Sequence, residues 1–207
     1  MKRTNLKVVG ITAAAVLALA GCGNDDSATG GEGSGGHNQA DVTFAQEMIP
    51  HHAQAVQMAE MAQEGAASGQ VKKLADDIRS AQDPEIELMT GWLEAWGEDV
   101  PDTGGMGGEG AGDMDHGMDH GAADDDSGAA AMPGMMSEQE MDDLGAASGA
   151  TLDTMWLEMM IEHHEGAIEM ARTEQATGEN PDAVALAEDI ETAQAEEIGT
   201  MERLLGS

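Results

Sequence analysis

The spacing of apolar residues near the C-terminal end of the chain predicts two amphipathic helices. Along the first, inward positions recur at steps of three, four and seven residues: Trp156, Met160, Ala167, Ala171 and Glu174. Along the second, the inward positions are Val184, Ala187, Ile190, Ala193 or Gln194, Ile198, Met201 and Leu205. Such steps gather side chains on one side of an α-helix. Long β-branched runs and strict alternation are absent, so no sheet is expected.

A turn separates these two helices. Residues 177–181 read TGENP, in which Asn180 suits the N-cap and Pro181 the first helical position. A similar break lies between Gly65 and Gly69. Each half of the chain therefore reads as a helical hairpin.

Much of this pattern occurs twice. A shift of 112 positions aligns residues 41–93 with residues 153–205 without a gap. The matches include Asp41 with Asp153, Met48 with Met160, His51-His52 with His163-His164, Met58 with Met170, Gln82 with Gln194, Glu85 with Glu197 and Met89 with Met201. One hairpin cannot bury its apolar stripe alone, but two equivalent hairpins can bury theirs against each other. We therefore expect an all-α protein, a four-helix bundle of two duplicated hairpins.

Composition divides the chain into six segments. They are a signal peptide (1–21), a disordered tether (22–40), the first hairpin (41–97), a flexible linker rich in Met, His and Asp (98–136), a short connecting helix (137–149) and the second hairpin (150–207). The tether and the linker are rich in Gly and polar residues and show no helical or strand period. The connecting helix begins with a capping-box pattern at residues 137–140.

The first residues resemble a bacterial lipoprotein signal. Basic residues precede an apolar run, residues 8–20, that is too short to span a bilayer as a permanent helix. The run ends in LAGC, which resembles a lipobox whose Cys22 would carry lipid. We expect a lipid-anchored protein on the extracytoplasmic side of the cell envelope; the alternative is a secretion signal with a chance cysteine. Because Cys22 is the only cysteine, intramolecular disulfides and thiolate metal sites are excluded.

The charge balance excludes one class of partner. The formal net charge is −33, and residues 80–171 contain no Arg or Lys. Nucleic acid binding needs a basic surface, so nucleic acid is not expected as a partner. An acidic surface concentrates cations instead, although most of these carboxylates only solubilise the protein.

Two cassettes, MIPHHAQAVQMA and MIEHHEGAIEMA, carry the most distinctive chemistry. On a helical wheel, the two histidines of each cassette flank the inward stripe. Neutral imidazole and thioether groups are ligands for soft or borderline metals, Cu(I) above all. The candidate metal ligands are Met48, His51, His52, Met58, Met160, His163, His164 and Met170. In the alternative interpretation, the methionines fill the core and the histidines are only hydrogen-bonded.

The second helix of each hairpin carries polar residues on its inward side. These are Gln82, Glu85 and Met89 in the first copy, and Gln194, Glu197 and Met201 in the second. Buried polar groups need partners, and we expect the histidines to be those partners. The carboxylates would then orient the imidazoles from a second shell. Direct ligation by the glutamates and a purely structural polar network stay open as alternatives.

The linker contains a further candidate site. Within DMDHGMDHG, the secondary metal ligands would be Met114, His116, Met118 and His120. A segment so rich in Gly and Asp has no core for methionines to fill, which favours metal capture. The alternative is a low-complexity stretch of biased composition.

The cassettes resemble the bacterial family called domain of unknown function 305. The matching residues are Asp41, Phe44, residues 48–52, Ala55, Met58, Ala59, residues 132–137, Leu144, Gly149, residues 159–168, Met170 and Ala171. The resemblance covers residues 41–207 and implies a ferritin-like helical bundle in the cell envelope, with copper binding and resistance in some members. Trp156 stands where the family usually has Phe.

We therefore expect a lipoprotein that binds copper, preferably Cu(I), and buffers it, confers tolerance or passes it to a copper-handling envelope protein. No reaction is implied, so an enzyme is not expected. A rival interpretation is a helical interaction module that docks an envelope partner, with the histidine pairs structural. A redox enzyme using the bundle's metal is a third. Metal binding should weaken as histidines protonate below about pH 6. The sequence leaves the oligomeric state open.

Overall fold

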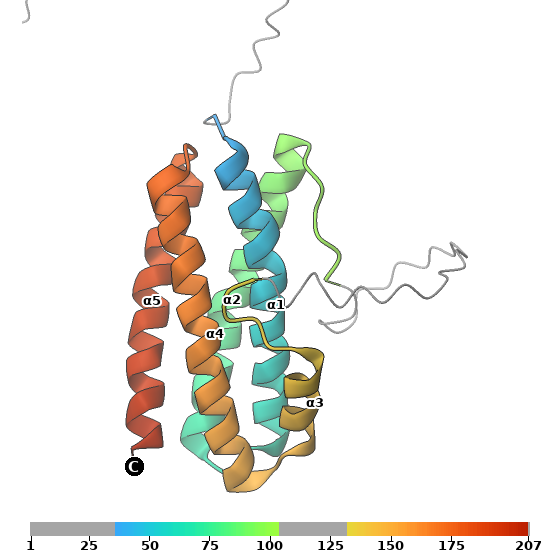
Figure 1. The fold of residues 1–207 in the computed structure, drawn as a ribbon, viewed down its shortest axis with the longest axis vertical. Coiled ribbons are helices and arrows are strands. Elements are labelled where there is room, and N and C mark those ends of the chain that lie inside the picture. The colour runs from blue at the N-terminus through green and yellow to red at the C-terminus, as the bar shows by residue number, and fades with distance from the viewer. Residues whose placement is uncertain (1–35, 104–131, 207) are drawn as a thin grey trace, which may run out of the picture. The chain divides into compact units, whose positions relative to one another are not determined.

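The computed structural model describes residues 36–103 and 132–206. Within them the chain forms five α-helices and no strand: α1 (Gln39–Gly65), α2 (Gly69–Trp96), α3 (Glu138–Ala146), α4 (Gly149–Thr177) and α5 (Pro181–Leu205). Helices α1 and α2 pair closely, as do α4 and α5, and α1 packs on α4 (Figure 1). The expected all-α four-helix bundle of two hairpins is confirmed.

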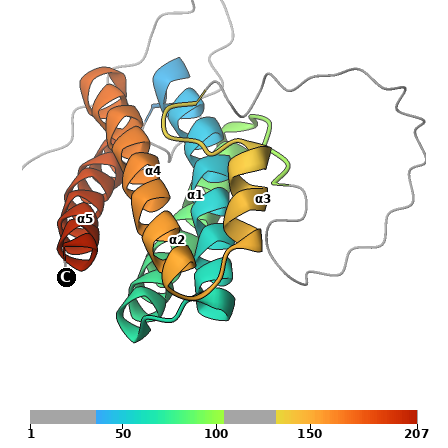
Figure 2. The ribbon, with the colours of Figure 1, turned by 60° about the horizontal axis from the view of Figure 1, so that its bottom comes forward.

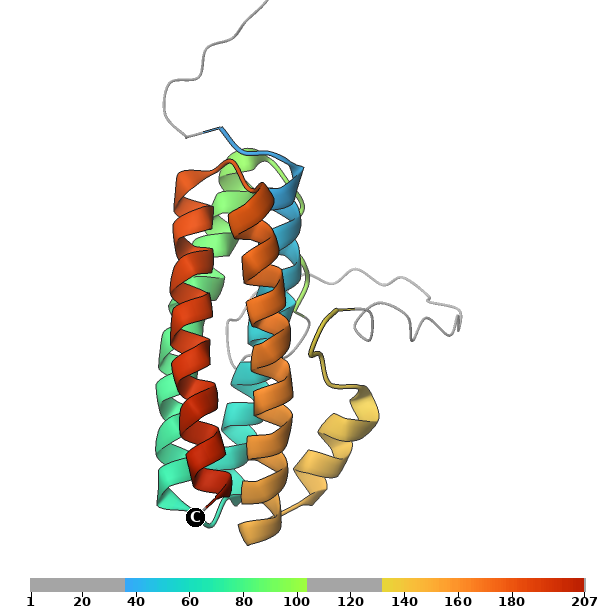
Figure 3. The same cartoon turned by 60° about the vertical axis from the view of Figure 1, so that its left-hand side comes forward.

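The central pair of the bundle is α1 and α4, which run in opposite directions (Figure 1). Helices α2 and α5 form the second pair across the two hairpins and contact each other more sparsely than α1 and α4 do. The short α3 contacts both α1 and α4 and lies along one half of their length (Figures 2 and 3). Within the described ranges, no helix is both long and apolar enough to cross a membrane.

The helix starts follow the expected capping chemistry. Asn180 accepts hydrogen bonds from the first backbone N–H groups of α5, and Pro181 takes the first helical position. Ser137 and Glu140 form the capping box of α3. A further capping box, which the sequence analysis did not identify, joins Asn38 and Asp41, so α1 begins within the segment assigned to the tether.

Helix α1 begins at Gln39 and continues through Pro50. One residue differs from the sequence-based expectation. Leu205 was placed on the inward face of the last helix, yet 38% of it is exposed because α5 ends there. Of the two candidates at the middle of α5, Gln194 and not Ala193 is buried.

Two aspartates tie each hairpin to the turn of the other. Asp41 accepts hydrogen bonds from the backbone N–H groups of Glu179 (3.1 Å) and Asn180 (2.9 Å) in the α4–α5 turn. Asp153 accepts from Ala67 (3.0 Å) and Ser68 (3.0 Å) in the α1–α2 turn. These residues correspond under the 112-residue shift, so the duplicated units hold each other reciprocally.

The core consists of two hydrophobic clusters. One, here named the Phe44 cluster, contains Met48, Met89 and Met170, among others. The other, the Trp156 cluster, contains Met58, Met160 and Met201, and its Trp156 donates to the carbonyl of Met58 at 2.9 Å. The two trios correspond under the duplication. Along α1 and α4, the histidines lie between the two clusters.

The reciprocal aspartates predict a stability effect. Replacing Asp153 by alanine removes a carboxylate that accepts from two backbone N–H groups, so the free energy of unfolding should fall by about 1.5–3 kcal/mol. Urea unfolding followed by circular dichroism measures it. Asp142→Ala, an exposed site on α3, is the control and should change stability by less than about 0.5 kcal/mol. Equal effects of the two substitutions would refute this role of Asp153.

Candidate functional site

The four cassette histidines meet at the centre of the bundle. His51, His52, His163 and His164, here named the histidine layer, each have 0% of their surface exposed. The rings of His51 and His163 contact each other, with centroids 3.8 Å apart and planes inclined by 40°. These two residues are equivalent under the duplication. The approximate twofold axis between the hairpins therefore passes through this contact.

Hydrogen bonds to one ring nitrogen fix the tautomer of three histidines. His51 Nε2 lies 3.1 Å from the carbonyl oxygen of Pro133, which can only accept. His52 Nε2 and His164 Nε2 each lie 2.7 Å from a carboxylate oxygen, of Glu85 and Glu197 respectively. In each case Nε2–H donates, so the Nδ1 atom is the one that carries the lone pair in the neutral form of the ring.

The opposite ring nitrogens face the interior without partners. The Nδ1 atoms of all four histidines are buried and make no hydrogen bond. Neither nitrogen of His163 makes a well-formed hydrogen bond; it has only a weak contact with the backbone of His51. A buried polar atom left unpaired costs about 1–3 kcal/mol, so this layer is expensive for the fold.

Burial keeps the two central histidines neutral. Desolvation, with a smaller contribution from the neighbouring His52 and His164, lowers the pKa of His51 to about 3. Desolvation and the three other imidazoles also hold the pKa of His163 well below 6.5. The expected protonation near pH 6 is therefore wrong for these two residues, because helical spacing alone does not show that they are fully buried. Their lone pairs stay available at pH 6.

The predicted second shell is only partly formed. Glu85 and Glu197 bond to histidines as expected, reaching the layer from side chains that are 22% and 20% exposed. Gln82 does not, because neither of its buried amide atoms has a hydrogen-bond partner. Gln194 is equally buried, and its amide oxygen has none. The remaining members, Met89 and Met201, are fully buried in the core.

The methionines are grouped across the cassettes and not within them. Met48 of the first cassette shares the Phe44 cluster with Met170 of the second. Met58 and Met160 share the Trp156 cluster in the same way. Because α1 and α4 are antiparallel, each side of the histidine layer receives one methionine from each cassette. A site at this layer would therefore use both copies of the repeat.

Among the described residues, no group of three or more His, Cys, Asp or Glu side chains is arranged to hold a metal ion. A metal at the histidine layer would need thioether ligands or a change of side-chain rotamer. The other predicted ligands cannot be placed, because Met114, His116, Met118 and His120 lie outside the described residues. Cys22 also lies outside them.

Residues 132–137, here named the strap, cross α1 and α4 at the level of the histidine layer. On α1, the Gln54 amide donates to the Met136 carbonyl (2.9 Å) and accepts from the Met136 N–H (2.7 Å). On α4, Gly134 has a φ of 74° and lies so close that a Cβ there would meet the Glu162 carbonyl oxygen at 2.6 Å. A Cβ at Gly166 would overlap the Pro133 carbonyl. Most of the strap lies within residues 98–136, where a flexible linker was expected; the Pro133-Gly134 pair is the sequence signal for a turn there.

A buried carboxyl pair was also not identified from the sequence as a possible site. Asp41 and Glu174 are 0% and 1% exposed. Burial, then a hydrogen bond to Asp41 and its charge, raise the pKa of Glu174 to about 8. Burial also raises the pKa of Asp41, but hydrogen bonds from Asn38, Glu174, Asn180 and Glu179 outweigh it and lower the pKa overall. Glu174 is thus the protonated partner, although its counterpart in the first repeat is Ala62.

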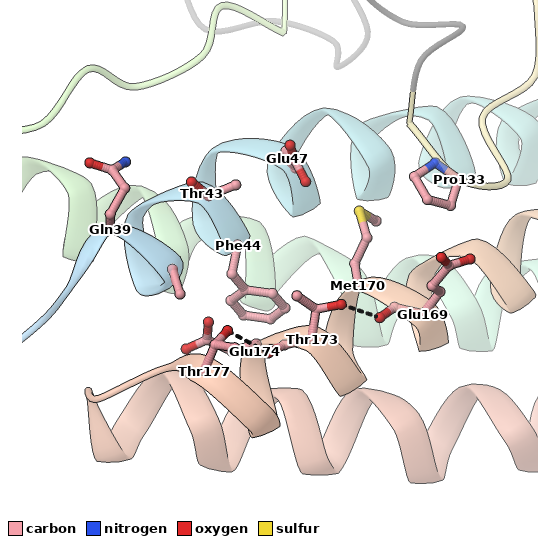
Figure 4. A pocket seen from close by; sticks show the side chains of 11 residues that line it. Gln39, Thr43, Phe44, Glu47, Pro133, Glu169, Met170, Thr173, Glu174 and Thr177 are labelled. Carbon is pink, nitrogen blue, oxygen red and sulfur yellow. Dashed lines mark hydrogen bonds between the residues drawn. The ribbon is translucent and has the colours of Figure 1, made fainter.

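A pocket of about 380 Å³ lies between α1 and α4 on the side of this carboxyl pair (Figure 4). Its lining includes Phe44, Glu47, Pro133, Glu169, Met170 and Glu174. Figure 4 shows the Met170 side chain rising from α4 toward α1, between Glu47 and Pro133 in this view. The pocket therefore combines a thioether, carboxyl groups and the strap.

Comparison with known proteins identifies relatives of this fold. The family model described as Domain of unknown function (DUF305) matches residues 41–205. A search of curated proteins finds no match. Among solved structures, a DUF305 protein of Streptomyces coelicolor, described as secreted, is 29% identical with a TM-score of 0.65, over 81% of this chain and 92% of that one. A DUF305 fragment from Deinococcus radiodurans is 30% identical with a TM-score of 0.65, over 82% and 97%.

A third similar structure is CopM in its Cu(II)-bound form. It is 32% identical with a TM-score of 0.60, over 80% of this chain and 95% of that one. CopM has also been solved in Cu(I)-bound, Ag-bound and apo forms, with TM-scores of 0.57.

The packing of the strap predicts an effect of Gly166→Ala. The added methyl group overlaps Pro133, so stability should fall by about 1–3 kcal/mol, as for an overpacked core. Gly91→Ala is the matched control, since nothing lies within 4 Å of its Cβ, and there alanine should stabilise α2 by about 0.5–1 kcal/mol. Urea unfolding of both variants provides the measurement. A stabilising Gly166→Ala would mean that the strap does not pack there.

The raised pKa of Glu174 predicts a pH dependence of stability. Between an unfolded-state pKa near 4.5 and a folded-state pKa of about 8, the folded protein retains a proton that the unfolded chain has lost. The free energy of unfolding should therefore decline through that window as the pH rises. Glu174→Gln should make this decline shallower, whereas the exposed Glu188→Gln should leave it unchanged. Identical pH profiles for wild type and Glu174→Gln would contradict this prediction.

Proposed function

The chain belongs to the DUF305 family, and we propose that it is a copper-binding protein of the cell envelope that holds Cu(I) at the histidine layer. The similarity to CopM, which was crystallised with Cu(I), Cu(II) and Ag, supports a copper-related role. The S. coelicolor relative described as secreted supports a location outside the cytoplasm. The metal is a cargo that is buffered or passed on, so no enzymatic step is required.

The observation that carries this proposal is the set of unpaired Nδ1 atoms. Four buried imidazoles bring lone pairs into one layer, and no protein donor satisfies them. A cation at this position would take the place of the missing hydrogen bonds and offset part of the free-energy cost of burying these nitrogen atoms. Burial that keeps His51 and His163 neutral also keeps them competent as ligands.

The neighbouring sulfur atoms favour a soft metal. Met48 and Met170 flank the layer on one side, and Met58 and Met160 flank it on the other. Thioether and imidazole together select Cu(I) over hard divalent cations. Glu85 and Glu197 would act through His52 and His164, since a carboxylate that accepts from Nε2–H raises the basicity of Nδ1.

The proposal also gives roles to Cys22, to residues 114–120 and to the acidic composition of the chain. Cys22 would carry the lipid anchor, and the string from Met114 to His120 would capture metal more weakly than the bundle. The acidic composition would raise the local cation concentration, while the soft ligands would supply selectivity.

An anaerobic Cu(I) competition titration of the protein tests this function. Glu85→Gln/Glu197→Gln keeps all four imidazoles but weakens their orientation, and should lower Cu(I) affinity by about 10–100-fold. Glu188→Gln/Glu196→Gln removes the same charge from exposed positions of α5 and should leave the affinity unchanged. Circular dichroism verifies that each variant is folded.

Two further variants separate the possible sites. Changing all four layer histidines to alanine should abolish tight binding, and deleting residues 104–131 should remove only weaker ions. If the histidine variant binds as wild type does and only the deletion loses copper, the histidine layer is structural. If wild type itself binds Cu(I) no better than a denatured control, the interaction module becomes the better interpretation.

A further inference from the structure

The histidine layer has no surface of its own. All four rings have 0% exposure, with the two hydrophobic clusters on either side along the bundle axis. The strap lies across α1 and α4 at the same level. An ion bound at the layer must therefore have passed between helices, and the groove between α1 and α4 contains a pocket on one such route.

The two halves of that groove are equivalent in sequence but differ in structure. In one half, Met141 and Leu144 of α3 pack into the Trp156 cluster. The partly buried residues packed against this cluster include Met61, Met155 and Met159. Their counterparts in the other half are Thr173, Thr43 and Glu47, which line the pocket of Figure 4. The duplication thus supplies an internal comparison: one half is closed by a helix, and the other is left hollow, with threonines and glutamates among its lining residues.

The lining of the hollow half includes two residues that lie near the histidine layer. Pro133 lines the pocket, and its carbonyl oxygen accepts the hydrogen bond from His51 Nε2. Met170 also lines the pocket and lies about two helical turns beyond His163 on α4. Met170 is 7% exposed, whereas its counterpart Met58 is 0% exposed. The same two residues therefore contact both the pocket and the surroundings of the layer.

The pocket contains groups that an entering cation would contact one after another. Glu47 of α1 and the exposed Glu169 of α4 bring carboxylates from its two walls. Glu174 adds a buried carboxyl whose oxygens have no hydrogen-bond partner other than Asp41. The counterparts of Glu169 and Glu174 are Gln57 and Ala62, so the fold itself does not require acids at these positions. The carboxylates attract any cation, and the thioether prefers a soft one.

We propose that the pocket between α1 and α4 is the entrance through which a soft monovalent metal ion, Cu(I) or Ag(I), reaches the histidine layer. The ion first encounters Glu47 and Glu169 and then passes Met170 beside Pro133. This inference rests on the proposed function. It concerns the rate at which the ion arrives and not the strength with which the layer holds it.

The test measures the rate of loading and the final occupancy of the same protein. Ag(I), which does not change oxidation state, is mixed with the full chain in a stopped-flow instrument and followed by tryptophan fluorescence. Mass spectrometry gives the number of ions bound at equilibrium. Glu47→Gln/Glu169→Gln should slow loading by about three- to tenfold through lost electrostatic attraction, with occupancy unchanged. Glu188→Gln/Glu196→Gln carries the same change in net charge at exposed positions of α5 outside the pocket lining, and should load at nearly the wild-type rate.

A steric variant tests the same route without changing charge. Thr43→Leu/Thr173→Leu places apolar side chains where the covered half has Met155 and Met61, and should slow loading while leaving occupancy unchanged. If both charge variants slow loading equally, only the overall negative field matters and the entrance is refuted. If all variants load at the wild-type rate and occupancy, the ion arrives elsewhere and the function stands. If wild type binds no Ag(I) or Cu(I), the proposed function fails, and the entrance fails with it.

Discussion

The structure depends on one constraint: four imidazoles are buried at the centre of the bundle, and their nitrogens have too few hydrogen-bond partners. The contact between His51 and His163 joins equivalent positions of the two hairpins, so the layer exists only where both hairpins meet. Two carboxylates and one strap carbonyl hold the outer nitrogens. The four Nδ1 atoms have no protein partner and could bind a ligand in the layer. The free-energy cost of burying them must be offset by a bound ligand, or the layer must serve the specific pairing of the two hairpins.

The parts of the structure that the sequence could predict are those with a local or repeated signal. Helical spacing and capping residues identified the hairpins, because a helix is built from contacts within three or four residues. The duplication then gave the bundle, since two equal apolar faces cover each other. Even the pairing of Glu85 with a cassette histidine followed, because a carboxylate on the inward side of a helix needs a donor and the repeat offered the same candidates twice.

The parts that the sequence could not predict are contacts between segments far apart in the chain. Residues 132–136 carry no periodicity, so their packing on Gln54 and Gly166 was not visible. The grouping of Met48 with Met170 depends on the antiparallel direction of α1 and α4, which spacing within one cassette does not contain. Glu174 was placed on the inward face, but its raised pKa depends on the extent of its burial and on the distant Asp41. Likewise, only the packed structure shows that His51 loses its usual pKa.

The two duplicated hairpins correspond to the subunits of a symmetric dimer, but here a single covalent chain contains both. In a dimer of identical chains, every substitution occurs twice, and both faces across the symmetry axis must change together. Here the two halves are separate stretches of one chain, so a substitution in one half does not change the other. Methionines and α3 close one face, while threonines and glutamates line the other. One half can thus be optimised for packing and the other for exchange with solvent, a division of labour around a shared central layer that a symmetric dimer could not adopt.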